Sequence, residues 1–294
     1  KTAYEMLRSL VGSENVYKRQ LLPREDVPRG SERSHRLKKT MNSTTFLIVC
    51  PLVFLAGFVD AIGGGGGLIS LPAYLFAGIP VHTAIGTNKF SAVFGTTLAT
   101  GRFAKQGMIE KRLALPAVAA AFVGASIGAR LSLRMPERMT LIILLVILPF
   151  VAFLVLNKNL LRDRSPEEEQ ITGRTYVTAA ASAFLVGIYD GLYGPGTGTF
   201  LIVLLNVWSR LGLKSANGQA KAINLATNLS SLIVFLMHGT VLIPLGLSAA
   251  VCNMIGAYLG AGLALKQGSK AIRPVLLLVL VLLFVKIISQ LLGQ

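Results

Sequence analysis

The stretch GFVDAIGGGGG, residues 57–67, decides the fold of this chain, because it sets a lone aspartate, Asp60, in an apolar run and then ends that run with five consecutive glycines. Glycine adopts backbone conformations that other residues avoid, so we expect a helix to break there. The stretch GIYDGLYGPGTG, residues 187–198, repeats this organisation around Asp190. With the aspartates aligned, the matching glycines are Gly64 with Gly194 and Gly66 with Gly196. An internal repeat with an interrupted helix in each half is typical of transporter folds.

The composition predicts a membrane protein. Of the 294 residues, 53% are hydrophobic and 14% are charged, whereas about 25% are charged in a typical soluble domain. From residue 45 onward the chain consists mostly of apolar runs of membrane-spanning length. The net charge of +16 does not indicate a nucleic-acid partner, because the positive residues gather in short loops between these runs.

We predict four segments along the chain. The first is polar and aperiodic, and parts of it resemble translated sequencing-adapter and thrombin-linker sequence. We therefore expect a disordered extension foreign to the natural protein, which would start at Met41; a basic tail that binds anionic lipid is the alternative. The segments are the extension 1–40, a first transmembrane repeat 41–157, a charged linker 158–175 and a second transmembrane repeat 176–294.

Ten helical runs are expected from the hydropathy pattern. The runs 67–79 and 197–209 follow the glycine breaks and are too short to span a bilayer at about 1.5 Å per residue, so we interpret them as half-helices. The full set is 45–62, 67–79, 82–101, 112–132, 138–157, 176–190, 197–209, 215–238, 241–264 and 270–292.

Loop charge favours an inverted arrangement of the two halves. If each broken pair of helices re-enters on its own side, every strongly positive loop except one lies inside, and the halves have opposite orientation. The exception carries Arg130, Arg134 and Arg138. If every long segment crossed once instead, two positive loops would face outward. The inside loops are 102–112, 158–174, 210–214 and 266–273. We predict an all-α membrane protein with about eight transmembrane helices in two inverted repeats, whose first helices are broken by glycine.

Asp60 and Asp190 are the only acidic residues inside apolar runs after Met41. A carboxylate in hydrocarbon costs a few kcal/mol, so it faces the protein interior and is a functional candidate. The structural alternative is that each aspartate caps backbone N–H groups freed at its own break. Both roles stay open, as coupling or structural residues.

The glycine tracts are candidates for anion binding. A half-helix that starts after such a tract exposes N–H groups, and its positive dipole end attracts anions. No Walker motif is present, because no Gly-Lys-Ser/Thr follows either tract. Close helix packing is the alternative, and it explains the scattered Gly124, Gly128, Gly256 and Gly260 better than five consecutive glycines. The candidates are Gly64, Gly65, Gly66, Gly194, Gly196, Thr197 and Gly198.

Two lysines occupy matching places in the repeat. With a two-residue slip, Lys89 aligns with Lys221, each about two turns into a helix. A lysine near a helix end often extends to the interface instead of binding a ligand. The match favours two cations that converge on a central cavity, with Asn88, Asn224 and Asn228 as neutral donors beside them.

The motifs as a set resemble the sulfite exporter TauE/SafE family of bacterial membrane permeases. The motifs are Gly57-x-x-Asp60-x-x-Gly63 with the glycines up to Gly67, Ala84-x-Gly86-Thr87-Asn88-Lys89, Asp190-Gly191-x-Tyr193-Gly194-Pro195-Gly196-Thr197-Gly198 and Ala216-Asn217-x-x-Ala220-Lys221-x-x-Asn224. The resemblance covers about residues 45–292. It implies an inner-membrane transporter of about eight helices for small sulfur-containing anions such as sulfite or organosulfonates.

We therefore expect a secondary transporter of a small anion in the bacterial inner membrane. The substrate would be sulfite, an organosulfonate or a related sulfur-containing or carboxylated metabolite. No cofactor, metal or nucleic acid is expected, and the lipid bilayer is a partner, with a homo-oligomer left open. The alternatives are a non-transporting scaffold or assembly subunit, and an intramembrane enzyme, for which the sequence offers no metal-binding HExxH motif.

Overall fold

The computed structural model describes residues 43–134, 168–169, 171–268, 270–275, 277–278 and 281. Within these ranges all regular structure is helical, and no strand occurs. The expected extension 1–40 and helix 138–157 lie outside the described residues, as do most of the linker and most of the run 270–292.

The first half of the chain contributes four described helices. α4 (Ser43–Gly63) ends inside the glycine tract and α5 (Gly67–Phe76) begins at its last residue, so the predicted break is confirmed. α6 (Val81–Lys105) and α7 (Lys111–Ser132) follow. α5 ends at Phe76 rather than at residue 79, because Gly78 takes a φ of 78° that stops the helix.

The second half repeats this order of elements. α9 (Gly173–Leu192) ends before the second glycine tract, and α10 (Thr197–Val207) begins right after Gly196, whose φ is 86°. α11 (Leu213–Met237) and α12 (Ile243–Gln267) follow. The helices expected in the described ranges are therefore confirmed, with shifts of a few residues at their ends.

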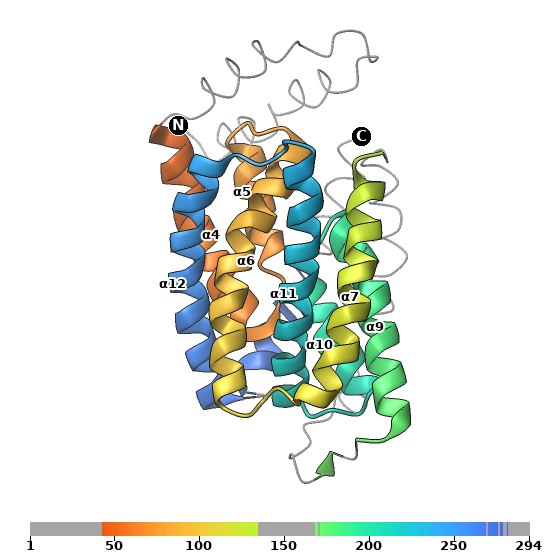
Figure 1. Cartoon of the computed structure of the whole chain (residues 1–294). Coiled ribbons are helices and arrows are strands. Elements are labelled where there is room, and N and C mark those ends of the chain that lie inside the picture. Colours follow the sequence, from red (N-terminus) through yellow and green to blue (C-terminus); the bar gives the residue numbers. More distant parts are fainter. Residues whose placement is uncertain are drawn as a thin grey trace.

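The two broken helices enter the bundle from opposite ends (Figure 1). α4 begins at the upper end of the view and α5 returns to that end, whereas α9 begins at the lower end and α10 returns there. The breaks meet inside the bundle, where a Cβ added to Gly64 would lie 2.2 Å from the backbone nitrogen of Thr199. Real Cβ atoms never come so close to backbone, so only glycine allows the two breaks to cross.

Glycines also let whole helices approach closely. α12 packs on α4 where a Cβ on Gly256 would lie 2.0 Å from the Phe54 carbonyl oxygen. α7 packs on α9 in the same way, with 2.0 Å between a Cβ on Gly128 and the Ile188 carbonyl oxygen. Gly124 and Gly260 make equivalent contacts, so the packing role expected for all four scattered glycines is confirmed.

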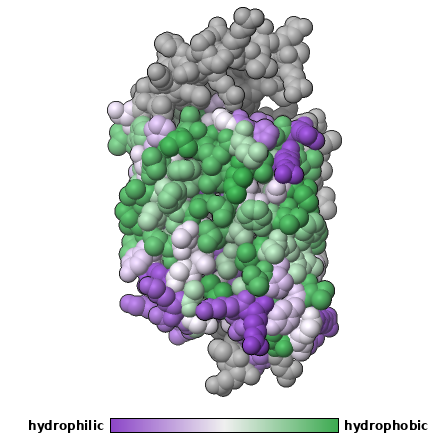
Figure 2. All heavy atoms as spheres, in the orientation of Figure 1, coloured by the Kyte–Doolittle hydropathy of each residue, from purple (hydrophilic) through white to green (hydrophobic). Residues whose placement is uncertain are grey.

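The outer surface of the bundle is apolar, as a lipid environment requires. Figure 2 shows a broad hydrophobic belt with hydrophilic residues gathered at the two ends. Within the described ranges, α4, α7, α11 and α12 are each long and apolar enough to span a membrane, by length and composition. The α6–α7 connection, the α10–α11 connection and the end of α12 lie at the lower end (Figure 1). The exposed positive residues in or beside these segments are Lys105, Lys111, Arg112, Arg210, Lys214 and Lys266. The chain is an all-helical membrane protein.

Candidate functional site

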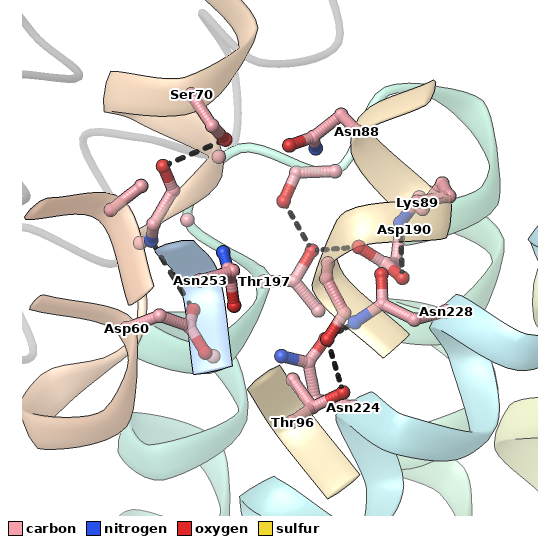
Figure 3. Close-up of a pocket in the computed structure, with 18 residues that line it drawn as sticks. Asp60, Ser70, Asn88, Lys89, Thr96, Asp190, Thr197, Asn224, Asn228 and Asn253 are labelled. Atoms are coloured by element: carbon pink, nitrogen blue, oxygen red, sulfur yellow. Dashed lines mark hydrogen bonds and ion pairs between the residues drawn. The ribbon is translucent and has the colours of Figure 1, made fainter. Parts of the chain in front are cut away.

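A small polar cavity lies in the bundle at the crossing of the two breaks (Figure 3). Its volume is about 40 Å³, which fits a few water molecules or one small ion, since about 10–15 Å³ on the same measure holds one water. Helices from both halves of the chain line it. The lining residues are Ala56, Asp60, Gly65, Gly66, Gly67, Ser70, Asn88, Lys89, Ala92, Thr96, Asp190, Gly194, Gly196, Thr197, Gly198, Asn224, Asn228 and Asn253.

The starts of both half-helices face this cavity. Gly66 and Gly67 bring the first turn of α5 to it, while Thr197 and Gly198 bring the first turn of α10. Several of the first N–H groups already donate to carbonyl oxygens of the breaks, as Leu68 N does to Gly65 O and Thr197 N to Gly194 O. What each helix start brings to the cavity is therefore mainly the partial positive charge of its helix dipole. Two such helix starts on one small cavity form a region that favours a negative charge.

An ion pair joins the two halves of the chain at one wall of the cavity. The Nζ atom of Lys89 on α6 lies 2.6 Å from Oδ2 of Asp190 on α9, and the two side chains are 3% and 2% exposed. The Thr197 hydroxyl lies 2.6 Å from Oδ1 of the same carboxylate. It also lies 2.6 Å from the carbonyl oxygen of Gly194. Lys89 is therefore a buried cation whose ammonium group borders the cavity.

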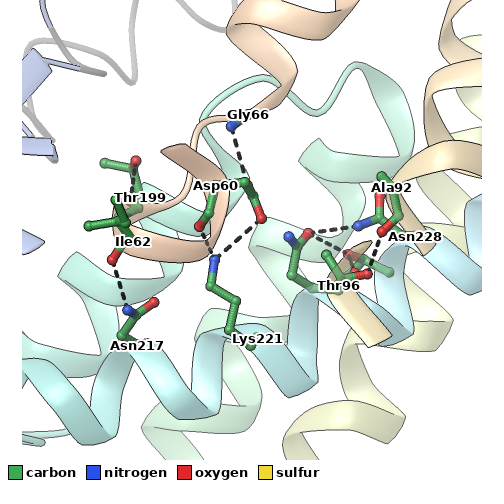
Figure 4. A network of polar contacts seen from close by, with 12 residues as sticks. Asp60, Ile62, Gly66, Ala92, Thr96, Thr199, Asn217, Lys221 and Asn228 are labelled. Carbon is green, nitrogen blue, oxygen red and sulfur yellow. Dashed lines mark hydrogen bonds and ion pairs between the residues drawn. The ribbon is translucent and has the colours of Figure 1, made fainter. Parts of the chain in front are cut away.

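A second ion pair joins the halves in the opposite sense (Figure 4). Lys221 on α11 lies 3.3 Å from Oδ2 of Asp60 on α4, and it also donates to the backbone carbonyl of Asp60. Neighbouring side chains satisfy the next carbonyl groups of α4, with Asn217 Nδ2 at 2.8 Å from Ile62 O and Thr199 Oγ1 at 2.9 Å from Gly63 O. Lys221 thus completes a set of donors that hold the C-terminal end of α4.

The two aspartates have different surroundings. Asp60 accepts a hydrogen bond from the Gly66 backbone nitrogen at 3.2 Å, which is the capping contact across the break, and its side chain is 19% exposed. Asp190 has Lys89 and the Thr197 hydroxyl as its partners. The capping geometry is therefore present at Asp60, whereas Asp190 pairs with a cation at the cavity wall.

Four amide side chains line the cavity. Asn228 Nδ2 donates to Asn224 Oδ1 at 3.2 Å, and this contact orients both amides. Asn253 on α12 reaches the Val53 carbonyl at 3.5 Å while it lines the cavity. Asn88 on α6 lines it beside Lys89. In the part of the chain that the structure describes, no three His, Cys, Asp or Glu side chains come together as metal ligands.

Most site residues expected from the sequence come together here, and two lie elsewhere. Of the expected set, the cavity lining leaves out Gly64 and Lys221. Gly64 is buried in backbone contact between the breaks, and Lys221 lies behind Asp60 at the end of α4. Both positions depend on contacts between the halves, which the repeat pattern does not contain.

Sequence reasoning missed three polar residues of the lining. Ser70 follows the first glycine tract by one helical turn, and its hydroxyl donates to the Gly66 carbonyl at 3.1 Å. Thr96 is the repeat counterpart of Asn228, by the spacing that relates Lys89 to Lys221, so the internal repeat could have found it. Asn253 carried a weaker signal, as an isolated amide in an apolar run.

Comparison with known proteins extends over most of the chain. The sequence profile of the sulfite exporter TauE/SafE family matches residues 49–287. The chain is 34% identical to a probable membrane transporter protein, ORF9, of Sinorhizobium sp., over 83% of this chain and 92% of that protein. It is 31% identical to the probable membrane transporter protein YfcA of Escherichia coli strain K12, over 83% of this chain and 89% of that one.

A relative of lower sequence identity is also named as a probable membrane transporter. The chain is 26% identical to the probable membrane transporter protein YdhB of Bacillus subtilis strain 168, over 73% of this chain and 87% of that protein. No solved structure matches the chain. The profile match spans both glycine breaks, both lysines and the whole cavity described above. This chain therefore belongs to the sulfite exporter TauE/SafE family.

Proposed function

We propose that this protein is a secondary transporter that moves a small anion across the bacterial inner membrane. The observation that carries the proposal is the cavity at the crossed breaks, where two helix starts and the ammonium group of Lys89 meet. Such a cavity deep in an apolar bundle is typical of the substrate sites of secondary transporters. The relatives are named as probable membrane transporters, and this supports transport here too.

The size and chemistry of the cavity favour an oxyanion with few atoms. A volume of about 40 Å³ excludes large organic anions in this state of the protein. Each amide carries two N–H donors, so Asn228 and Asn253, which each donate once within the protein, keep a second donor for an oxygen atom of the anion, and Lys89 supplies the charge. Sulfite, a short organosulfonate and a short carboxylate carry several acceptor oxygens in a compact group, so we propose this class as the substrate.

The proposed architecture is a pair of inverted repeats with about eight transmembrane helices. Three features of the described helices support it. The broken helices enter from opposite ends, and α12 packs on α4 as α7 packs on α9. Each lysine also pairs with the aspartate of the other half, so an exchange of the two halves maps one ion pair onto the other. The repeats 41–157 and 176–294 and the linker 158–175 stay predictions.

Cysteine labelling tests the inverted arrangement. In a background with Cys50→Ser and Cys252→Ser, we expect Phe76→Cys to react with a membrane-impermeant maleimide added outside intact cells. Lys214→Cys is expected to react only after the membrane is opened, because its loop is positive and belongs inside. Phe76 is the last residue of the half-helix α5, and Lys214 comes a short loop after the half-helix α10, so labelling of both from the same side would contradict the inverted repeat.

Ligand binding tests the proposed substrate class. Sulfite, methanesulfonate, sulfate and acetate are each added to the purified protein, and the midpoint of thermal unfolding is measured. A ligand present at 100 times its Kd stabilises the folded state by about 2.7 kcal/mol, so a bound anion is expected to raise the midpoint by several degrees. Chloride at equal ionic strength is the control. Equal midpoints with all four anions and with chloride would contradict an oxyanion site.

The alternative of a non-transporting scaffold fits the structure less well. A scaffold would not need two ion pairs and four amides near a cavity. Buried polar groups destabilise a bundle unless they are fully paired, so a scaffold would be more stable with apolar residues there. An enzyme would need a nucleophile beside a base, or a metal. Among the described residues the two carboxylates of the lining, Asp60 and Asp190, are each paired with a lysine, so neither is an unpaired base.

A further inference from the structure

The charges around the cavity cancel. Lys89 is neutralised by Asp190, and Lys221 is neutralised by Asp60. An anion that entered the cavity would therefore find no net positive charge on these side chains, only the partial charges of the two helix starts. It would also meet the carboxylate of Asp190, which is 2.6 Å from the cation that the anion needs. This is the central difficulty for the anion site proposed above.

A second negative charge beside Lys89 would be expensive in a buried site. Three charges, two of them negative, would share a space with little water to screen them, and the unbalanced charge would not be compensated by hydrogen bonds alone. One proton removes the conflict. If the carboxylate of Asp190 becomes neutral as the anion arrives, the site holds one cation and one anion, as it did before.

We propose that Asp190 takes up one proton whenever Lys89 binds a monovalent anion, so that anion and proton cross the membrane together as an electroneutral pair. This inference rests on the proposed function. The exchange is balanced in charge and atoms: the Lys89–Asp190 ion pair, a free anion and a proton from water become a Lys89–anion pair and a neutral carboxylic acid. Release on the other side reverses the exchange, and the ion pair forms again.

Thr197 is placed to support Asp190 in both protonation states. Its hydroxyl lies 2.6 Å from the carboxylate oxygen Oδ1 and 2.6 Å from the Gly194 carbonyl. A hydroxyl has one proton to donate, so it can serve one of these two acceptors at a time. With Asp190 ionised, Thr197 donates to the carboxylate. With Asp190 protonated, the acid donates to Thr197, which then donates to Gly194, and both short contacts become hydrogen bonds.

The other groups around Asp190 leave Lys89 as its one charged partner among the described residues. α7, which packs against α9, presents the small residues Ala125 and Ala129 at this level. α11 presents the amides Asn224 and Asn228 to the cavity. On the neighbouring turns of its own segment, the titratable groups are the phenols of Tyr189 and Tyr193.

Asp60, across the cavity, is a different case, because Lys221 and the Gly66 backbone nitrogen both bind it. Its loss of charge would leave the end of α4 with an uncompensated lysine. Nothing in the surroundings of Lys221 places its ammonium group against the cavity where an anion could replace Asp60. The proton therefore belongs on Asp190. The two ion pairs match in the repeat but differ in function, because only the Lys89–Asp190 pair has its lysine at the cavity.

The first experiment uses the wild-type protein in liposomes with methanesulfonate, a monovalent anion that stays fully ionised near neutral pH. Exchange of labelled methanesulfonate at equal pH reports the anion site itself. A gradient of one pH unit is then imposed, which at one proton per anion supports up to about tenfold accumulation. We expect the anion to accumulate to this extent and the receiving side to become more acidic. We expect the same accumulation when a potassium gradient with valinomycin sets the membrane potential.

The second experiment identifies the proton carrier. Asp190→Asn is expected to lose accumulation driven by the pH gradient, since its amide cannot take the proton, and whatever exchange it shows at equal pH is expected to be uncoupled from protons. Asp60→Asn is the matched control, and its ratio of protons to anions is expected to equal that of the wild type, whatever its rate. Thr197→Val is expected to shift the pH profile of exchange, and Thr197→Ser to restore it.

The outcomes separate the two proposals. Absence of wild-type exchange would overturn the anion site, and the coupling with it. Exchange without any response to the pH gradient, or with a response to membrane potential, would overturn electroneutral coupling while the anion site stands. Wild-type coupling that persists in a folded Asp190→Asn protein would remove the proton from this residue. If that variant does not fold, the wild-type proton and potential measurements still decide the coupling.

Discussion

Replacement of Lys89 by methionine is expected to lower the rate of methanesulfonate exchange by about 10- to 100-fold, because a hydrogen-bonded ionic contact to the anion is worth about 1.5–3 kcal/mol and each 1.4 kcal/mol corresponds to a factor of ten. Lys89 is the cation whose ammonium group borders the cavity, and it is 3% exposed. Methionine retains much of the length of the side chain and removes the charge. The measurement is initial exchange rate in liposomes at equal amounts of folded protein.

The single variant also leaves Asp190 without its partner, and removal of one member of a buried ion pair destabilises a protein by about 3–5 kcal/mol. Loss of exchange could then reflect loss of folded protein. The double variant Lys89→Met with Asp190→Asn removes both charges and is expected to unfold at a temperature close to that of the wild type. Exchange at a wild-type rate in this folded double variant would contradict a binding role for Lys89.

The equivalent double variant at the second ion pair is Lys221→Met with Asp60→Asn. The repeat alone predicts that both lysines bind the anion. In the structure Lys221 contacts the end of α4 and does not line the cavity, so this double variant is expected to lose stability more than affinity. An equal loss of anion affinity in both double variants would restore the prediction of two equivalent cations.

Replacement of Gly64 by alanine is expected to prevent the two breaks from crossing and to unfold much of the protein. Gly64 has a φ of 80°, and the left-handed conformation costs an ordinary residue about 1–2 kcal/mol. Its added Cβ would also lie 2.2 Å from the Thr199 nitrogen and 2.3 Å from the Gly198 carbonyl carbon, so backbone of α10 would have to move. The expected loss is about 2–5 kcal/mol, since overpacking in a tight core adds about 1–3 kcal/mol to the strain.

Gly78 provides the control for this prediction. Its φ of 78° is nearly that of Gly64, but no atom lies within 4 Å of an added Cβ. Gly78→Ala therefore carries the backbone strain alone, and the difference between the variants isolates the contact between the breaks. Size-exclusion profiles and thermal unfolding in detergent measure both. Equal stability of the two alanine variants would show that the breaks are free to separate.

Much of the fold could be predicted from the sequence, because a membrane imposes local rules. Backbone groups in hydrocarbon must be paired within the segment, so long apolar runs become helices, and glycine tracts such as 63–67 mark their interruptions. The breaks, the half-helices α5 and α10 and most of the cavity lining follow from hydropathy and the internal repeat. These features depend on residues close together in the chain, so they can be predicted from a single sequence.

The tertiary structure decided which charges meet. From sequence, Asp60 and Asp190 were equivalent, as were Lys89 and Lys221. In the fold each lysine pairs with the aspartate of the other half, and only one of the two ion pairs places its lysine at the cavity. These pairings depend on how the two halves rotate and cross, and that crossing is set by contacts such as Gly64 against α10. Repeat symmetry identifies matching residues, but packing between the halves sets what each one touches.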